Sequence, residues 1–330
     1  MSKICIIYTH HKLGDLIWQL PYIKSISDYH KKKVEIIVRP KTQAKELLID
    51  LKHIENIYYN EFRKGLHYWL DVWNLIKIFK NKKYSFVYIL DKVNKPAIAA
   101  KVSGIKNIIG PGLKNQKNWL TNDNFLENKD MKLSYSEQSQ KLLKINSIKI
   151  KDYFPNIQFK NTRYKNFVKN NNIKNNRIVF GIDSFEDYKI WYEKNFIILA
   201  DLLYQKKLFD YAYLICSREK AYLAKKIITL SKKNYFIDCS KYNLQEIALI
   251  IKNSNFFVGN NSGPLNLAAA LNVKSYGLIV NDPVSELKFS KINPIHPKNY
   301  VDNKWIRTRS NMKTLKPKAV FEYILKDLKK

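Results

Sequence analysis

The sequence predicts two α/β domains, each built around a doubly wound and mostly parallel sheet. Short apolar runs of strand length alternate with amphipathic segments of helix length from the first residues onward. This alternation stops after Pro111 and resumes at Arg177. The chain has 330 residues, and this length is more than one hydrophobic core usually supports. Hydrophobic residues make up 45% of it, as expected of a packed globular protein. We therefore expect two domains, residues 1–155 and 156–330, with a cleft between them.

The first domain is expected to alternate strands with helices. Its strands are short apolar runs: Lys3–Tyr8, Val34–Val38, Ile54–Tyr58, Phe86–Leu90 and Ile105–Ile109. Its helices carry apolar residues at helical spacing: Leu16–Asp28, Thr42–Ile49, Leu66–Phe79 and Asn94–Val102. Because a segment of helix length separates successive strands, the strands should pair in parallel.

A polar stretch from Pro111 to about Lys151 separates the two alternating regions and contains one expected helix, Tyr135–Lys144. The following segment, Asp152–Phe159, should be an extended connector because Pro155 disfavours helix at the residue before it. The domain boundary is expected in this connector.

The second domain repeats the same alternation after an asparagine-rich run at Asn170–Asn176. Its expected strands are Arg177–Asp183, Tyr211–Cys216, Tyr235–Asp238, Asn255–Gly259 and Lys274–Leu278. Its expected helices are Lys194–Gln205, Glu219–Thr229, Leu244–Lys252 and Pro264–Leu271. Open parallel sheets bind ligands beyond the carboxyl ends of their strands, so the loops there should carry the function.

The net charge of +31 would attract any polyanion, such as nucleic acid, acidic lipid or a phosphorylated glycolipid. However, 52 of the 59 basic residues are lysine, and they are spread along the whole chain beside abundant asparagine. Sites that bind phosphate in a bidentate manner favour arginine, so this composition indicates a general drift toward lysine and asparagine. A nucleic-acid-binding function is disfavoured because no recognition motif accompanies the charge.

The three cysteines indicate a reducing compartment. Cys5, Cys216 and Cys239 are far apart in apolar runs and form no CxxC pair, as expected of buried free thiols. No apolar stretch approaches the roughly 20 residues that a membrane span needs. We therefore expect a cytoplasmic protein.

The segment His10–Pro21, HHKLGDLIWQLP, directly follows the first expected strand. Gly14 would allow a tight turn, and Asp15 would begin the next helix with its carboxylate exposed. Such an aspartate could accept a proton from a hydroxyl group, although an ordinary helix N-cap is the simpler explanation. Three basic residues would attract an anion to this edge or simply be solvated: His10, His11 and Lys12.

The segment Asn255–Val273, NFFVGNNSGPLNLAAALNV, predicts a buried strand, a turn at residues 260–263 and a helix with Pro264 in its first turn. The backbone N–H groups of Ser262 and Gly263 would lie at a helix end that favours phosphate. No GxGxxG pattern or Walker-type lysine is present, so the usual dinucleotide and NTPase sites are not supported. A plain strand-turn-helix with a serine N-cap is the alternative.

The segment Gly181–Phe196, GIDSFEDYKIWYEKNF, follows the first strand of the second domain. Ser184 and Lys189 would supply a hydroxyl and an ammonium group to hold a diphosphate and stabilise the charge of a leaving group. Trp191 is expected to pack. The remaining acids are expected to be solvated, since no histidine or DxD pattern beside them indicates a metal site: Asp183, Glu186 and Asp187.

The expected helix Leu66–Phe79 carries Trp69, Trp73 and Ile76 at helical spacing, with lysines nearby. This pattern would suit a membrane surface. Packing in the core of an α/β domain is nevertheless the expectation.

Taken together, these segments resemble glycosyltransferase family 9, whose best-known members are the lipopolysaccharide heptosyltransferases. The "GD…P" pattern of that family is matched by Gly14, Asp15 and Pro21, and its "K-x-W" pattern by Lys189 and Trp191. The family's "DSG-P-H-AAAL" stretch is similar to Asn261–Leu271. The similarity also includes an acidic strand end, a helix before the connector and a closing helix: Asp91, Tyr135–Leu143 and Asn311–Leu325.

The resemblance implies a GT-B fold, with two Rossmann-like doubly wound domains that face a central cleft. Residues 1–155 would bind the acceptor, and residues 156–330 the nucleotide sugar. The implied reaction is an inverting, metal-independent transfer of a heptose-like sugar from a nucleotide diphosphate donor, such as ADP-heptose, to lipopolysaccharide core or a related cell-surface glycan. No cofactor and no nucleic acid are implied. The protein would be a cytoplasmic monomer, at the inner leaflet of the membrane that holds its glycolipid acceptor.

The resemblance also assigns roles to single residues. Asp15 would be the catalytic base, with Gly14, Lys12 and Asp91 on the acceptor side. Residues of the second domain would hold the donor diphosphate: Ser184, Lys189, Asn261, Ser262, Gly263 and Asn266. The nucleoside would lie near Glu219 and Tyr242.

The sequence departs from the family's pattern at three places. Asn261 stands in place of an aspartate, and Asn266 in place of a histidine. Both of these changes remove a titratable group near the phosphates, although asparagine can still form hydrogen bonds. They motivate the alternative of a non-catalytic relative that binds a nucleotide or a glycan. The third departure replaces the glycine-rich turn before Glu219 with Cys216, Ser217 and Arg218.

Overall fold

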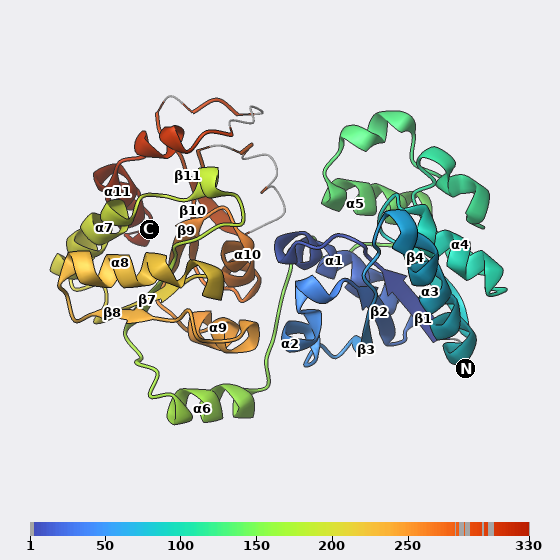
Figure 1. The fold of residues 1–330 in the computed structure, drawn as a ribbon, viewed down its shortest axis with the longest axis horizontal. Helices are drawn as coiled ribbons and strands as arrows, with labels where there is room; N and C mark the ends of the chain where they lie inside the picture. Colours follow the sequence, from blue (N-terminus) through green and yellow to red (C-terminus); the bar gives the residue numbers. More distant parts are fainter. Residues whose placement is uncertain are drawn as a thin grey trace. The chain divides into compact units, whose positions relative to one another are not determined.

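A computed structural model describes residues 3–280, 282–283, 287, 291–298, 300–302 and 307–329. The chain divides into two compact units, Met1–Gln158 and Phe159–Lys330 (Figure 1). Each unit contains a parallel sheet covered by helices, so the predicted class of two doubly wound α/β domains is confirmed.

The first unit contains a five-stranded sheet in which every neighbouring pair is parallel. Its strands are β1 (Lys3–Ile7), β2 (Val34–Val38), β3 (Ile54–Tyr59), β4 (Tyr84–Ile89) and β5 (Asn107–Ile109). Their order in the sheet is β3-β2-β1-β4-β5. The chain therefore proceeds outward from β1 to β3 and then returns to the other side of β1, which creates a switch point between β1 and β4.

The helices of the first unit are α1 (Leu13–His30), α2 (Ala44–Leu48), α3 (Tyr68–Lys82), α4 (Asn94–Val102) and α5 (Tyr135–Ile145). Short 3-10 turns occupy Pro40–Thr42, Gly65–His67, Lys114–Trp119 and Asn128–Lys132. Alternate residues of β1 point to opposite faces of the sheet. Cys5 and Ile7 pack in one core cluster with α3 and α4, while Ile4 and Ile6 are buried on the other face. Both faces of the sheet are thus covered.

Helix α3 differs from expectation in which side chains it buries. Val72, Leu75 and Phe79 are in the core, but Trp69 is 66% exposed and Trp73 is 56% exposed. The expected core packing of the two tryptophans is therefore wrong. Helical spacing accounts for this, because residues 69 and 73 form one stripe and the buried residues form another.

The second unit contains a six-stranded parallel sheet with the order β11-β10-β9-β6-β7-β8. Its strands are β6 (Arg177–Gly181), β7 (Tyr211–Ile215), β8 (Phe236–Asp238), β9 (Phe257–Asn260), β10 (Ser275–Leu278) and β11 (Ile292–Ile295). Here the chain proceeds outward from β6 to β8, and then from β9 to β11 on the other side. The switch point lies between β6 and β9.

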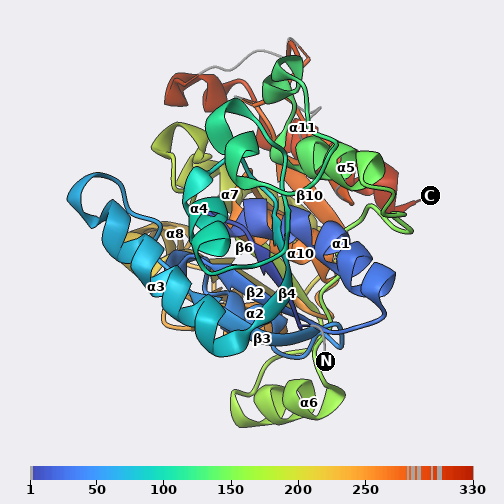
Figure 2. The same ribbon diagram turned by 90° about the vertical axis from the view of Figure 1, so that its right-hand side faces the viewer.

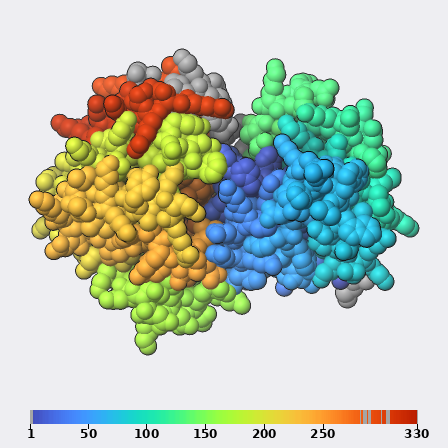
Figure 3. Space-filling view, in the orientation of Figure 1, coloured from blue at the N-terminus to red at the C-terminus, as the bar shows by residue number. Residues whose placement is uncertain are grey.

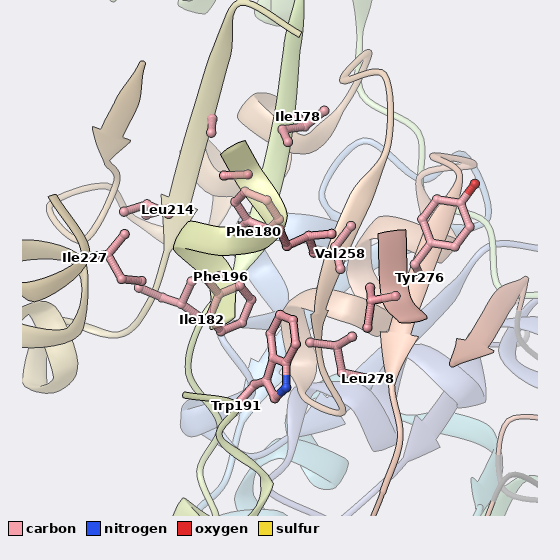
Figure 4. Packing of buried hydrophobic residues seen from close by; sticks show 14 of the residues in the cluster. Ile178, Phe180, Ile182, Trp191, Phe196, Leu214, Ile227, Val258, Tyr276 and Leu278 are labelled. Carbon is pink, nitrogen blue, oxygen red and sulfur yellow. The ribbon is translucent and has the colours of Figure 1, made fainter. Parts of the chain in front are cut away.

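The helices of the second unit are α6 (Asn161–Asn170), α7 (Glu193–Gln205), α8 (Ala221–Ser231), α9 (Leu244–Ile251), α10 (Gly263–Ala270) and α11 (Pro317–Leu328). Further 3-10 turns occupy Asp187–Lys189, Arg218–Lys220 and Arg309–Lys313. One face of the sheet packs against α7, α8 and α11. Figure 4 shows part of this core, with Phe196 of α7 and Ile227 of α8 beside residues of the strands. The expected packing of Trp191 is confirmed, since the side chain is fully buried there and donates a 2.9 Å hydrogen bond to the Leu315 carbonyl.

Two elements of the second unit were not expected from the sequence. Helix α6 buries only Phe167, so its hydrophobic periodicity is too weak to predict a helix. Strand β11 contains Pro294, and proline normally argues against a strand. It is tolerated because β11 lies at the edge of the sheet, where one side has no strand to accept a hydrogen bond from it.

Candidate active site

The motifs predicted to carry the function follow the strands at the two switch points. In the first unit, residues 8–15 follow β1 and residues 90–93 follow β4. In the second unit, residues 182–189 follow β6 and residues 261–263 follow β9. In open α/β sheets this position, beyond the carboxyl ends of the strands, is where ligands bind.

Asp15 lies in the first turn of α1. The helix begins at Leu13, with Lys12 as its N-cap and without a side-chain capping bond. The expected tight turn at Gly14 is therefore wrong, because Gly14 is the second residue of the helix. The alternative of Asp15 as the N-cap is also wrong, because Lys12 occupies that position. Asp15 is half-buried, and a carboxylate in the first turn is favoured by the helix dipole.

Asp91 is buried at the end of β4, with 1% of its surface exposed. Its two carboxylate oxygens accept hydrogen bonds from the backbone N–H groups of Thr9, at 2.6 Å, and Val93, at 3.0 Å. Burial raises the pKa of Asp91, and the bonds from Thr9 and Val93 act against this rise. Asp91 thus fixes the segment after β1 to the end of β4.

Tyr8 is buried between the end of β1 and Thr9, the residue bonded to Asp91. Burial raises the pKa of the Tyr8 phenol, and the negative charges of Asp15 and Asp91 raise it further. The carboxyl ends of β1 and β4 therefore hold two acids with different environments, one half-buried and one enclosed.

The basic residues beside Asp15 are not equivalent. His11 and Lys12 are exposed, whereas the His10 ring packs against Tyr135 with ring centroids 3.8 Å apart. Burial, together with nearby positive charges, lowers the pKa of His10 to about 4. His10 is therefore neutral at pH 7 and contributes no positive charge to this edge.

In the second unit, Lys189 lies against a carboxylate that the sequence analysis did not identify. Its ammonium group is 2.9 Å from an oxygen of Asp282, and the two side chains are only 11% and 2% exposed. The other oxygen of Asp282 accepts a 3.0 Å hydrogen bond from the Asn261 amide. Asp282 thus connects the segment after β6 to the segment after β9.

Ser262 occupies the N-cap position of α10, as the serine N-cap alternative requires, but it makes no capping bond. Its hydroxyl oxygen is buried and has no hydrogen-bond partner among the described residues. The Asn266 amide donates a 3.1 Å bond to the Ser262 carbonyl one turn earlier. The first backbone N–H groups of a helix lack partners within the helix, so the start of α10 offers donors to an anion.

The loop after β6 is held from the inside by Asp183. Only 8% of Asp183 is exposed, and its carboxylate accepts a 2.7 Å hydrogen bond from the Ser217 backbone. Burial raises the pKa of Asp183, with the bond from Ser217 acting in the opposite direction. The expectation that Asp183 is a solvated loop acid is therefore wrong. It is also wrong for Glu186, which is half-buried with its carboxylate 3.7 Å from the Lys189 ammonium, while Asp187 is exposed as expected.

Lys220, in the turn after β7, also fixes the loop that follows β6. Its ammonium group donates to the Ser184 carbonyl at 2.7 Å and to the Asp187 carboxylate at 2.5 Å. Ser184 is 3% exposed, so it lies inside the loop that Lys220 closes. The bonds of Asp183 and Lys220 make this loop a rigid part of the unit.

Asn260, the last residue of β9, also supports the candidate site, although no motif assigned it a role. It is fully buried, and its side-chain oxygen accepts a 3.0 Å hydrogen bond from the Trp191 backbone. Asn260 therefore fixes the position of the segment that carries Lys189. Only one feature of the sequence could have pointed to Asn260, namely a polar residue at the end of an otherwise apolar strand. Asp282, which follows the apolar strand β10, has a similar position.

The two residues expected near the nucleoside lie after β7 and β8. Glu219 is exposed in the Arg218–Lys220 turn, and Tyr242 is half-buried with its ring near Phe167. The Arg218 guanidinium donates a 3.3 Å bond to the Lys241 carbonyl, so the two turns are neighbours. The structure therefore brings both predicted residues to adjacent loops at the carboxyl edge of the second sheet.

Among the described residues, no group of three or more histidine, cysteine, aspartate or glutamate side chains is placed to hold a metal ion. The three cysteines are buried and free, as expected. No helix in the described part of the chain is both long and apolar enough to cross a membrane.

Comparison with known proteins gives a family and a set of similar structures. The model of glycosyltransferase family 9 (heptosyltransferase) matches residues 72–302. ADP-heptose lps heptosyltransferase II from E. coli has a TM-score of 0.76 and 16% identity, with 98% of each chain covered. The family 9 glycosyltransferase from Veillonella parvula DSM 2008 has a TM-score of 0.76 and 15% identity, covering 97% of this chain and 95% of its own.

E. coli heptosyltransferase WaaC, solved with ADP, has a TM-score of 0.71 and 15% identity, covering 99% of this chain and 98% of its own. At these identities the structural similarity shows the fold. None of the curated proteins matches the sequence. Because the family match extends over more than half of the residues, the chain belongs to glycosyltransferase family 9, the heptosyltransferase family, and is a glycosyltransferase.

Proposed function

We propose that this glycosyltransferase transfers a heptose-like sugar from an ADP-linked donor to a lipopolysaccharide core or a related glycolipid. The proposal includes inversion at the anomeric carbon, no required metal ion and action as a monomer at the inner leaflet. Support for the donor comes from similar structures: WaaC was solved with ADP and with ADP-2-deoxy-2-fluoro heptose. The observation that carries the proposal is Lys189, held beside the start of α10 at the switch point of the second sheet.

The donor diphosphate is proposed to lie between Lys189 and the first turn of α10. Lys189 supplies a positive charge, and the backbone of Ser262 and Gly263 supplies N–H donors. The Ser262 hydroxyl, buried without a partner among the described residues, would gain one from a phosphate oxygen. These groups stabilise the charge that builds on the diphosphate as it leaves.

The remaining donor residues have supporting roles in this proposal. Asn261 and Asn266 shape the turn after β9, through the bonds to Asp282 and to the Ser262 carbonyl. Ser184 would contact the diphosphate from the loop after β6, where Lys220 holds its carbonyl. Glu219 and Tyr242 would contact the ribose and the base. Their adjacent turns support this assignment, since a nucleoside spans two neighbouring loops at such an edge.

Asp15 is proposed as the general base. Its carboxylate takes the proton of an acceptor hydroxyl while that oxygen attacks the anomeric carbon of the donor. The bond from this carbon to the diphosphate breaks, and the nucleoside diphosphate departs with the electron pair. Lys12 and Gly14 flank Asp15 and would contact the acceptor, whereas the enclosed Asp91 would act by positioning the segment after β1.

Metal independence is proposed because Lys189 and the helix start already supply positive potential to the diphosphate. Another structure of this fold, the dodecameric iron-containing heptosyltransferase TibC in complex with ADP-D-beta-D-heptose, makes a direct test necessary. Transfer should continue at an unchanged rate after dialysis against EDTA. A rate that collapses and recovers with one added metal ion would contradict this part of the proposal.

A donor panel tests the proposed function. ADP-, GDP- and UDP-sugars are compared by thermal shift and calorimetry, followed by transfer to a core glycolipid. We expect ADP-linked sugars to bind most tightly and to be turned over. Binding without transfer or donor hydrolysis would instead indicate the non-catalytic relative, and preference for another base would overturn the donor assignment.

A further inference from the structure

We infer that the start of α3 is a docking surface for an anionic lipid bilayer. Four large apolar side chains are exposed there: Leu66 at 97%, Trp69 at 66%, Leu70 at 55% and Trp73 at 56%. Most apolar residues exposed on a protein surface occur singly and need no explanation, whereas a contiguous set marks an interaction site. We call these four residues the α3 surface.

Three members of the α3 surface lie on one side of the helix, because Trp69, Leu70 and Trp73 follow the i, i+1, i+4 spacing of a single helical face. The fourth, Leu66, lies in the 3-10 turn Gly65–His67 that leads directly into α3. The opposite stripe, which includes Val72, Leu75 and Phe79, is buried in the core of the unit. The first turns of α3 are therefore apolar on two sides, and only one of these sides packs against the core of the unit. Figure 2 shows α3 along the outside of its unit, with the preceding segment projecting from it.

The charges around the α3 surface are complementary to anionic lipid. Lys64, Lys77 and Lys80 are all exposed, and the Lys77 ammonium lies 5.7 Å from the centre of the Trp73 ring. Between residues 61 and 83, Glu61 is the one exposed acidic residue. Tryptophan favours the interface between lipid and water, and lysine side chains extend from such a surface toward head groups. Juxtaposed lysines strengthen binding to acidic lipids.

The buried side of α3 beneath the α3 surface is fixed to the rest of the unit by Asp71. Asp71, on the buried side of α3, lies 2.9 Å from the Arg63 guanidinium and 3.4 Å from the Lys95 ammonium. The Asn60 amide donates a 3.2 Å bond to the Asp71 carbonyl. Although burial raises the pKa of Asp71, hydrogen bonds from Arg63 lower it below its usual value. The acid at the base of the surface is thus paired inward, and it adds no repulsion toward a negative membrane.

A membrane is favoured over a soluble partner by the combination of features. The exposed residues are large and apolar, their surroundings are cationic, and the whole chain carries a charge of +31. The segment lies at the molecular surface in Figure 3. Interfacial binding of this kind needs only that side chains enter the head-group region, without a spanning helix.

Flotation with lipid vesicles tests this inference on the full chain. The vesicles contain phosphatidylcholine, with or without phosphatidylglycerol, and no glycolipid acceptor. We expect binding to the anionic vesicles, a blue shift of tryptophan fluorescence and release by salt. The variant W69S/W73S should bind about tenfold more weakly, because the lost aromatic area no longer enters the interface.

Matched variants separate the α3 surface from general effects. Tyr29 and Tyr222 are 55% and 58% exposed at other positions, so Y29S/Y222S removes similar exposed aromatic area. K64Q/K77Q/K80Q lowers the charge by the same amount as K31Q/K32Q/K33Q, a lysine cluster in the turn between α1 and β2. We expect the variants at Trp69, Trp73 and the α3 lysines to bind poorly, and both controls to bind like the wild type.

Three outcomes would overturn the inference: no wild-type binding, equal binding to neutral vesicles, or wild-type binding by W69S/W73S. A mass in light scattering that rises with concentration and falls to the monomer in W69S/W73S would assign the α3 surface to a second copy instead. Because no donor or acceptor is present, these results do not depend on the proposed chemistry. Circular dichroism confirms that each variant is folded.

Discussion

Asp282 holds two of the residues proposed to bind the donor. It lies 2.9 Å from the Lys189 ammonium and accepts a 3.0 Å hydrogen bond from the Asn261 amide. Glu186 is a second carboxylate beside Lys189, at 3.7 Å. The loop after β6 and the turn after β9 therefore share one buried carboxylate.

Replacing Asp282 by asparagine should weaken both folding and donor binding. The change removes the nearer of two carboxylates from the ammonium group of Lys189, which is 11% exposed, and leaves only Glu186 at 3.7 Å. Removing one member of a buried ion pair costs about 3 kcal/mol, and we expect a loss of this order in the free energy of unfolding. The measurement is urea denaturation together with calorimetric titration of the donor.

A surface pair provides the control for this experiment. Lys24 and Asp28 form an exposed i,i+4 pair at 2.6 Å, so Asp28→Asn should cost less than about 1 kcal/mol. Donor affinity should stay unchanged in that variant. If Asp282→Asn behaved like Asp28→Asn in both measurements, Asp282 would have no part in holding Lys189.

His10 should make stability depend on pH. Its pKa in the folded protein is about 4, lowered by burial, whereas an unfolded histidine titrates near 6.5. The stabilisation from neutral His10 is complete above pH 6.5, and it is lost as the pH falls toward 4, because the unfolded chain binds the additional proton. The loss amounts to about 3 kcal/mol across this window.

NMR titration of the imidazole protons measures this directly, and it can be compared with urea denaturation at several pH values. The His10 midpoint should lie near 4. His53 should titrate at a similar pH, since burial lowers its pKa to about 4 as well. Midpoints near 6.5 for both residues would refute the buried placement.

The sequence predicted most of the residues that we propose for the site, but not the contacts that hold them. Lys189, Ser262 and Asn261 belong to motifs with a recognisable spacing. Asp282 and Asn260 were missed because each is a single polar residue at or beyond the end of an apolar strand. Only the strand order brings Asp282 to Lys189 and Asn260 to the Trp191 backbone. Asp183 was misjudged because its burial depends on Ser217 of the neighbouring strand end, a contact that a local pattern does not contain.

At the scale of elements, β6 and β9 approach each other closely beneath the donor loops. Gly181 and Gly259 are register partners. A Cβ atom on residue 259 would lie 2.9 Å from the Gly181 carbonyl oxygen and 2.7 Å from the Phe257 ring. The two glycines therefore allow the switch-point strands to pair where a larger side chain would separate them.

Gly259→Ala should consequently destabilise the second unit by about 1–3 kcal/mol, the usual cost of overpacking. Donor affinity should fall as well, since the segment of Asn261, Ser262 and Gly263 follows directly. Thermal unfolding with and without ADP gives both quantities. Gly104→Asn serves as the control, because no atom lies within 4 Å of its Cβ position and asparagine tolerates the left-handed φ of 75°. An unchanged melting temperature in Gly259→Ala would contradict the close approach.

Strong periodicity made most elements predictable. The expected bounds of β2 and α4 agree with the structure at both ends, and α5 differs by one residue. Helix α6 was missed because it buries one side chain, and β11 because proline occupies its centre. The orientation of α3 was wrong because its sequence carries two apolar stripes, and periodicity does not tell which of two stripes faces the core.

At the scale of the whole molecule, the fold separates the two halves of the proposed reaction. The first sheet presents Asp15 and Asp91 at the switch point of β1 and β4. The second presents Lys189, Ser262 and Asp282 around the switch point of β6 and β9. In the proposed reaction the first unit supplies the base and the second supplies the donor site, so the two contributions should be separable by mutation.

The most direct test measures transfer and donor binding in the same preparation of Asp15→Asn. The account predicts that transfer falls by about 10²- to 10⁴-fold, the range for loss of a general base. The Kd for the ADP-sugar should stay within about twofold of the wild type, because its binding groups belong to the second unit. A transfer rate equal to that of the wild type would contradict the assignment of Asp15 as the base.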